Sequence, residues 1–177
     1  MNIPLLFLAS IIPDVDLFIP GVEHRGPTHS IILATLIFIP IFTHYGKDAA
    51  PYFIALIQHA LIGDYLTGGG IQLLWPINAI FYYGLTIEIT GLLNILLEWI
   101  FFLLCFIAMF RTRDARNLLR PHHSNLILSI PLLTVLLPTF LSLPLHVPLS
   151  LVIPRLAYLI LFSLSALVDF KTIFKKL

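Results

Sequence analysis

The chain has 177 residues, of which 59% are hydrophobic and only 11% charged, and its formal net charge at pH 7 is +1. Soluble domains are roughly half apolar and a quarter charged, so this composition, with a mean hydropathy of +0.99, excludes an ordinary soluble protein. It predicts a multi-pass protein of the cell membrane. No composition break or repeat divides the chain, so we expect one domain over residues 1–177. No nucleic-acid partner is expected.

Apolar runs bounded by charges, glycines and prolines predict an all-α fold with about five to six membrane helices. The first run is about 11 residues long, which is half the length that a spanning helix needs, so we expect a half-span or a re-entrant helix. Prolines inside the runs predict kinked helices, at Pro40, Pro131, Pro138 and Pro154. The expected segments are residues 3–13, 29–45, 51–66, 88–110, 122–143 and 149–168.

The ten lysines and arginines predict how these helices are oriented in the membrane. If the loop between Arg111 and Arg120 is cytoplasmic, alternation of the spans places eight basic residues, those of the C-terminus included, on that side. Only Arg25 and Arg155 then face outward. The same alternation predicts a site at the external face, because three polar segments meet there. These segments are residues 14–16, 24–30 and 59–70.

Two carboxylates follow the first apolar run. Asp14 and Asp16 can converge on one ion if the backbone is turned or extended, as the preceding Pro13 favours. The alternative is a solvated helix end with acidic residues at the water boundary. The pair alone does not decide between these two interpretations.

The most informative motif is a heptad, His-Arg-Gly-Pro-Thr-His-Ser, that begins at His24. Its glycine and proline break the chain before a helix that begins near Thr28, so His29 and Ser30 are expected in the first turn of that helix. Neutral imidazole is a common ligand of first-row metals, and the planar fork of Arg25 suits phosphate. The alternative is a cap-and-loop segment whose histidines lie in the headgroup region.

The third polar segment contains His59, Asp64 and a glycine turn. An ionisable residue inside an apolar span, such as His59, indicates a functional site because burying it without a partner is costly. Five residues on a regular helix separate two side chains by about 140°, but Gly63 can allow a bulge or an early helix end that brings Asp64 around. The glycines of residues 68–70 can present backbone N–H groups to an anion, or they can form a plain turn.

Together these segments supply three imidazoles and three carboxylates. A single catalytic zinc uses three protein ligands and water, so six candidates suit two ions about 3.5 to 4 Å apart, although one ion stays open. Zinc is the first expectation, and manganese or iron(II) also suits such ligands. The candidate metal ligands are Asp14, Asp16, His24, His29, His59 and Asp64.

The order of these motifs resembles the YdjM-like family of inner-membrane metal-dependent hydrolases. The resemblance covers residues 13–76: Pro-Asp-Val-Asp, the heptad, His59, Asp64-Tyr-Leu-Thr67, the glycine turn and Leu-Leu-Trp-Pro follow one another. It implies an all-helical membrane protein distantly similar to zinc-dependent phospholipase C and P1-type nucleases, which cleave phosphoesters with clustered metals. Two departures are expected to matter. Relatives have an upstream helix with another histidine, and they space the span histidine and the aspartate by four residues instead of five.

These observations predict hydrolysis of a phosphoester in a lipid or lipid-linked substrate by a metal-activated water. Arg25 is expected to clamp the phosphate, and Asp16 or Asp64 to orient the water. One alternative is a metal-binding or ion-translocating membrane protein without hydrolytic activity, and another is a scaffold with a structural metal. The sequence assigns no oligomeric state.

Other polar side chains are candidates for supporting roles. Thr28, Ser30 and Thr67 are expected to hydrogen-bond the metal ligands. Glu98, with Asn94 one turn before it, can either support a ligating histidine or stabilise helix packing. Arg155 can extend to the headgroups or bind a substrate phosphate.

Overall fold

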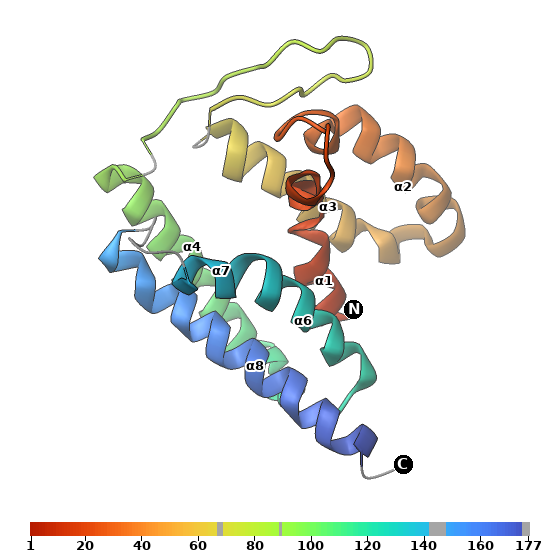
Figure 1. The fold of residues 1–177 in the computed structure, drawn as a ribbon. Coiled ribbons are helices and arrows are strands. Elements are labelled where there is room, and N and C mark those ends of the chain that lie inside the picture. The colour runs from red at the N-terminus through yellow and green to blue at the C-terminus, as the bar shows by residue number, and fades with distance from the viewer. Residues whose placement is uncertain (67–68, 89, 142–147, 175–177) are drawn as a thin grey trace. The chain divides into compact units, whose positions relative to one another are not determined.

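The computed structural model describes residues 1–66, 69–88, 90–141 and 148–174 (Figure 1). It divides into two compact units, residues 9–89 with Met1 and residues 2–8 with 90–177. Within the described ranges the ordered elements are helices, and the only β pairing is a single antiparallel bridge between Ile71 and Tyr82. The expected all-α class is therefore confirmed, whereas the expectation of one domain stays a prediction.

Four helical stretches of the described residues are long and apolar enough to cross a membrane, which confirms a polytopic membrane fold. The first of them contains two of the expected segments as the arms of one hairpin. The short N-terminal segment is not among the four, because its helix α1 covers only the seven residues Ile3–Ala9. The four stretches are Ile31–Tyr65, Leu92–Arg111, His123–Leu141 and Leu149–Phe170.

The first unit is built around a helical hairpin, drawn in orange to yellow in Figure 1. Its arms, α2 (Ile31–Tyr45) and α3 (Ala50–Gln58), pack through Phe38, Phe42 and Phe53, whose ring centroids lie between 5.1 and 5.8 Å apart. Two short 3-10 helices precede the hairpin, and a π-helix ends it. The elements are η1 (Ile12–Phe18), η2 (Pro27–His29), α2 (Ile31–Tyr45), η3 (Gly46–Ala49), α3 (Ala50–Gln58) and η4 (His59–Tyr65).

The hairpin begins later than the sequence suggested. Helix α2 starts at Ile31, with Ser30 as its N-cap, and the Ser30 hydroxyl oxygen accepts a hydrogen bond from the N–H of Leu33 at 3.3 Å. Because the cap residue is extended, the preceding Pro27–His29 forms a separate 3-10 turn. The expectation that His29 lies in the first turn of the long helix is therefore wrong. The His29 imidazole projects from the 3-10 turn, so the axis of α2 does not determine the direction in which it points.

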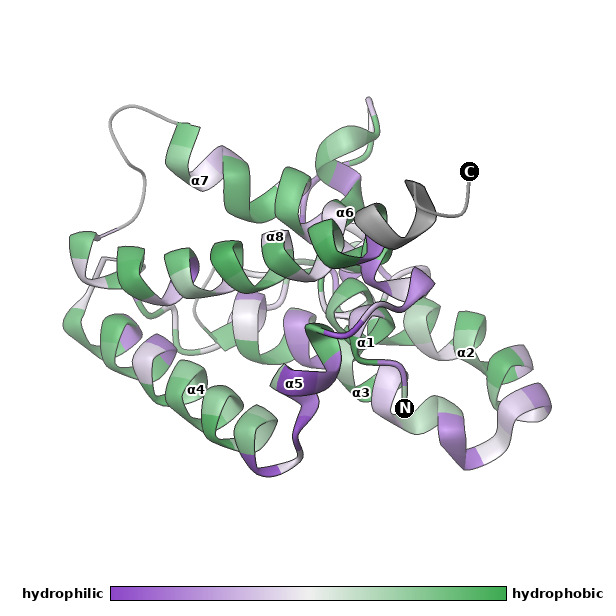
Figure 2. Cartoon of the chain, turned by 90° about the horizontal axis from the view of Figure 1, so that it is seen from below, coloured by the Kyte–Doolittle hydropathy of each residue, from purple (hydrophilic) through white to green (hydrophobic). Residues whose placement is uncertain are grey.

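The second unit contains the remaining helices, and Figure 2 shows hydrophobic residues along most of α4 (Leu92–Arg111) and α8 (Val152–Phe174). Its core consists of Met109, Leu118, Leu128, Leu136 and Phe162. The elements after α1 are α4 (Leu92–Arg111), α5 (Asp114–Leu118), η5 (His123–Leu128), α6 (Ser129–Pro131), η6 (Leu132–Leu136), α7 (Leu137–Leu141), η7 (Leu149–Leu151) and α8 (Val152–Phe174).

Some of the prolines lie where the helical structure is irregular, and others do not. Pro131 ends α6 and is followed by the π-helix η6, and Pro138 lies in the short α7, so this stretch is irregular as expected. Pro40 lies inside α2. Pro154 differs, because it is the third residue of α8, where the N–H of a helix has no intrahelical partner to lose.

Candidate metal centre

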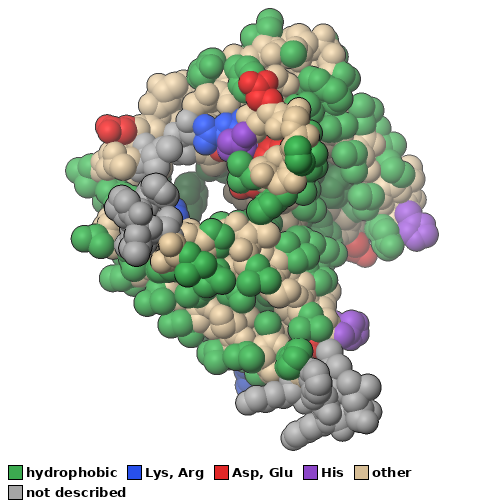
Figure 3. All heavy atoms as spheres, viewed as in Figure 1, with side chains coloured by type: hydrophobic (Ala, Val, Ile, Leu, Met, Phe, Trp, Pro, Cys, Tyr) green, Lys and Arg blue, Asp and Glu red, His purple; other side chains and the backbone are tan. Residues whose placement is uncertain are grey.

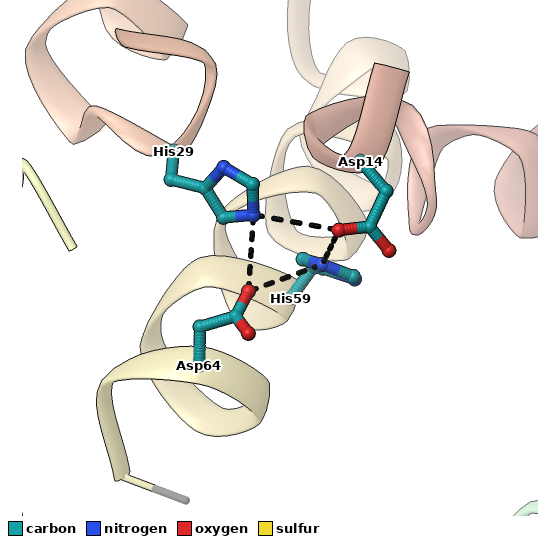
Figure 4. A group of neighbouring side chains, drawn as sticks. All are labelled: Asp14, His29, His59 and Asp64. Carbon is teal, nitrogen blue, oxygen red and sulfur yellow. Dashed lines mark ion pairs between the residues drawn. The ribbon is translucent and has the colours of Figure 1, made fainter. Parts of the chain in front are cut away.

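Four side chains from three elements of the first unit converge on one point (Figure 4). Asp14 comes from η1, His29 from η2, and His59 and Asp64 from the two ends of η4. Each offers one ligand atom, and these four atoms all lie within 4.8 Å of one another. The structure thus brings together residues that are up to 50 positions apart in the sequence.

The distances within this group are short and similar. The Nε2 atom of His29 lies 3.0 Å from Asp64 Oδ2 and 3.6 Å from Asp14 Oδ1. The Nε2 atom of His59 lies 3.2 Å from each of the same two oxygens. Ligand atoms about 2.0 to 2.1 Å from a tetrahedral ion are themselves about 3.3 Å apart, so these separations fit a single first-row cation.

The π-helix η4 explains how His59 and Asp64 meet although five residues separate them. In a π-helix the backbone hydrogen bonds join residues five apart, so the turn is wider than in an α-helix and side chains five apart point to nearly the same side. The bulge that the sequence allowed is therefore present. A Cβ at Gly63 would meet no neighbouring atom within 4 Å, so steric room at the glycine is not what the turn requires.

Buried donor atoms of this group lack ordinary partners. Within the described part of the chain, His29 Nε2 and Asp64 Oδ2 are buried and make no hydrogen bond, although they are close together. Lone pairs that face one another without a hydrogen between them are unfavourable unless a positive charge lies between them. Two imidazoles and two carboxylates without thiolate suit Zn²⁺, Mn²⁺ or Fe²⁺. The residues present therefore fit a divalent cation.

Asp16 is not one of the four converging residues, but it contacts residues that lie beside them. Its buried carboxylate lies 3.0 Å from His24 Nδ1, and it accepts hydrogen bonds from the Thr28 hydroxyl at 2.7 Å and the Arg25 N–H at 3.1 Å. The Thr28 oxygen in turn lies 3.1 Å from His29 Nδ1, which favours a proton on Nδ1 and leaves Nε2 free to bind a cation. Burial opposes ionisation of Asp16, but His24 and Thr28 outweigh it and lower its pKa.

A second group of possible ligands shares Asp14 with the first. The ligand atoms of Asp14, Asp16 and His24 also lie within 4.8 Å of one another. The six residues predicted from the sequence therefore divide into a group of four and a group of three with one carboxylate in common. His24 is the most exposed member, and Figure 3 shows acidic, basic and histidine side chains meeting in one patch of this surface.

The charges of the centre attract a cation. Burial opposes ionisation of Asp14, but the imidazoles of His29 and His59 outweigh it and hold the pKa of that carboxyl below its usual range. Burial also favours the neutral form of His29, yet the carboxylates of Asp14 and Asp64 outweigh it and raise the imidazole pKa. The centre thus favours positive charge, either as a proton on imidazole or as a metal ion.

Arg25 is fixed beside the centre at both its backbone and its side chain. Its φ of 64° is in the left-handed region, which a non-glycine residue adopts at a cost that the surroundings must offset. Its carbonyl accepts a hydrogen bond from the N–H of Gln72, and its Nε lies 3.0 Å from Asp64 Oδ1. The guanidinium packs against Gly69, where an added Cβ would lie 3.2 Å from Nη1.

The other predicted residues have different surroundings. Ser30 caps α2 and donates its hydroxyl hydrogen to the carbonyl oxygens of Leu73 and Trp75. Glu98 accepts a hydrogen bond at 3.1 Å from Asn94 of the same helix, and it lies 3.7 Å from Arg155 of α8 in the second unit. Thr67 lies outside the described residues.

Sequence reasoning overlooked Gln72. Its side chain is buried, and its backbone N–H holds the strained Arg25 in place. The available signal was an amide side chain directly after the glycine turn, in a run of uncharged and mostly apolar residues.

The family model described as YdjM inner membrane protein matches residues 1–143, a range that contains every residue of the candidate centre. No curated protein and no solved structure matches the chain.

Proposed function

The chain belongs to the YdjM inner membrane protein family, and we propose that it is a metal-dependent hydrolase that cleaves a phosphoester in a lipid-like substrate. The observation that carries the proposal is the convergence of His29 Nε2 and Asp64 Oδ2, both buried and without hydrogen bonds in the described structure, beside the guanidinium of Arg25. A cation and an arginine side by side suit a phosphoryl group.

The four converging residues would hold the cation, with zinc as the first choice and manganese or iron(II) as the others. A bound ion supplies Lewis acidity, which lowers the pKa of a water toward about 7 and polarises a phosphoryl oxygen. Asp16 orients His29 through Thr28, because the chain of contacts fixes which ring nitrogen carries the proton.

Arg25 and Asp64 have the two remaining roles, which are to neutralise charge and to orient the water. Arg25 neutralises the charge that develops on the phosphoryl oxygens, because its guanidinium is fixed next to the centre before substrate arrives. Asp64 orients the attacking water, because its carboxylate lies between the other converging residues and Arg25. Asp16 is less suited to that role, since its side chain is fully buried, whereas that of Asp64 is 11% exposed.

We place the centre at the external face of the membrane, as the distribution of basic residues predicts. Cys105 is the only cysteine, so single-cysteine variants in a Cys105→Ser background report the orientation. Glu23→Cys, near the centre, should react with an impermeant maleimide on intact cells. Asp48→Cys, in the exposed turn between α2 and α3, should react only after permeabilisation. The reverse pattern would place the centre inside.

A structural metal site is the second candidate, because four protein donors can fill the coordination of a tetrahedral zinc. Such a site would stabilise the fold without turnover. Ion translocation has less support. In residues 31–58, all of which are described, none of the buried side chains is polar, so the hairpin offers no relay away from His59.

The deciding experiment combines elemental analysis with hydrolysis assays on protein purified in detergent. We expect stoichiometric metal, and release of phosphate or headgroup from at least one lipid in a panel. His29→Ala should lose both, whereas His44→Ala, a change of an exposed histidine in the last turn of α2, should lose neither. Unchanged metal content in His29→Ala would overturn the proposal. Chelation that melts the helices, with no turnover of any lipid by the intact protein, would favour the structural site.

A further inference from the structure

A second feature of the first unit is a long uncharged segment that follows the glycine turn. Residues 71–87, here called the apolar arm, contain no Asp, Glu, Lys, Arg or His. They form an extended excursion in Figure 1, and large apolar side chains on it are exposed, with Ile77 at 76% and Ile80 at 61%. A soluble surface rarely exposes apolar side chains in such a group unless they bind something.

The apolar arm is a folded element. Ile71 and Tyr82 exchange two backbone hydrogen bonds of 3.0 and 2.9 Å, and the Asn78 amide donates to the Tyr82 hydroxyl at 3.0 Å. The N–H of Gly84 donates to the carbonyl of Tyr65 at 3.0 Å. A Cβ at Gly84 would collide with that carbonyl oxygen, so this position needs glycine.

The base of the arm is attached to the residues that flank His29. The carbonyl of Leu73 accepts hydrogen bonds from the Ile31 N–H and from the Ser30 hydroxyl, and the N–H of Gln72 donates to the Arg25 carbonyl. Hydrogen bonds therefore join the arm to the residues beside the candidate centre, so a displacement of the arm would shift Arg25 and Ser30.

These hydrogen bonds locate the arm at the open end of the hairpin, where the candidate span Ile31–Tyr65 both begins and ends. One contact is made at the first residue of α2 and another at the last residue of η4. Exposed apolar side chains therefore occur on the hairpin, such as Ile37 and Ile54, as well as on the arm. Trp75, Tyr82 and Tyr83 are of the types that gather where hydrocarbon meets headgroups.

We propose that the apolar arm binds the lipid bilayer at the boundary between headgroups and acyl chains, and that it holds the candidate centre at the surface of that leaflet. An amphiphilic phosphoester would then reach Arg25 laterally, with its acyl chains still in the membrane. The role in substrate delivery rests on the proposed function. The location of the arm in lipid does not, and it is tested separately.

The location is tested by spin labels on Ile77→Cys and Ile80→Cys in the Cys105→Ser background. The protein is placed in vesicles of phosphatidylethanolamine and phosphatidylglycerol, and collisions with oxygen and with a water-soluble nickel complex are measured. We expect oxygen to be favoured at both positions, and nickel at the control position Glu23→Cys. Nickel contact at 77 and 80 equal to that at 23 would show an arm in water. Low contact with both reagents would show an arm covered by protein, such as a second copy of the chain. Either result overturns the proposal.

Delivery is tested by comparing Ile77→Asp with Ile77→Leu. The aspartate should raise the KM for a lipid phosphoester in these vesicles several-fold and leave kcat/KM for a short water-soluble phosphoester unchanged, whereas the leucine should change neither. Equal loss on both substrates would contradict delivery. If no substrate is hydrolysed, the proposed function fails, and the spin labels still decide where the arm lies.

Discussion

The carboxylates of the two units differ in what surrounds them. In the second unit, Glu98 accepts a hydrogen bond from Asn94 and lies 3.7 Å from the guanidinium of Arg155. In the first unit, Asp64 Oδ2 and His29 Nε2 are only 3.0 Å apart, yet both lack hydrogen bonds within the described residues. The first arrangement satisfies a polar group between helices, whereas the second leaves buried donors for a ligand.

Asp169 of α8 sharpens this difference. It is buried, and its Oδ2 also makes no hydrogen bond in the described structure. No group of three or more possible metal ligands in the described residues includes it, however. A single unsatisfied oxygen therefore does not indicate a site. What distinguishes the first unit is that two such atoms, His29 Nε2 and Asp64 Oδ2, converge with ligand atoms of Asp14 and His59.

Removing one ligand of the candidate centre should give the largest difference between the two units. Asp64→Asn keeps the size of the side chain but replaces an anionic ligand with a weaker neutral one, so we expect the metal content of the purified protein to fall to background. Glu98→Gln makes the same kind of change in the second unit and should leave the metal content unchanged. Elemental analysis of both variants, with circular dichroism to confirm folding, makes the measurement. Loss of metal from Glu98→Gln would contradict the distinction.

Asp16→Asn should have an intermediate effect. If Asp16 acts by orienting His29 through Thr28, the amide should weaken metal binding about 10- to 100-fold without abolishing it. Titration against a chromophoric chelator gives the two dissociation constants. Loss as complete as in Asp64→Asn would instead make Asp16 a direct ligand, as the sequence alone suggested.

The residue types of the centre could be predicted because the chain is so apolar. Against that background, Asp14, His29, His59 and Asp64 are conspicuous, and the apolar runs between them are long enough to give the hairpin. These four residues come together because the beginning of α2 and the end of η4 lie close to one another. The π-helix was one of two possibilities for the five-residue spacing, and only the folded chain decides between them.

Contacts between distant parts of the sequence could not be predicted. Ser30 ends the 3-10 turn and caps α2 while its hydroxyl hydrogen goes to carbonyl oxygens 43 and 45 residues away, so its role depends on where the apolar arm lies. The left-handed backbone of Arg25 likewise depends on Asp16 and Gln72. Local propensity describes neither position, because tertiary hydrogen bonds decide both.

Arg25→Lys tests whether the arginine of the first unit differs in function from that of the second. Lysine keeps the charge but loses the planar fork, so we expect unchanged metal content and a roughly tenfold lower kcat/KM, since one charge-assisted hydrogen bond contributes about 1.5 kcal/mol. Arg155→Lys is the matched control and should leave hydrolysis unchanged. An equal fall in both variants would show that Arg155 also binds the substrate phosphate.

The smallest effect is expected where the second unit loses its ion pair. Arg155→Met should lower the free energy of unfolding by about 0.6 kcal/mol, the typical size of a polar contact between membrane helices, because Glu98 keeps its hydrogen bond from Asn94. A double-mutant cycle with Glu98→Gln, measured by unfolding in mixed detergent micelles, isolates the pairwise contribution. A coupling free energy of several kcal/mol between Arg155 and Glu98 would exceed that of an ordinary polar contact between membrane helices. The distinction between a satisfied helix contact in the second unit and a candidate ligand site in the first would then no longer hold.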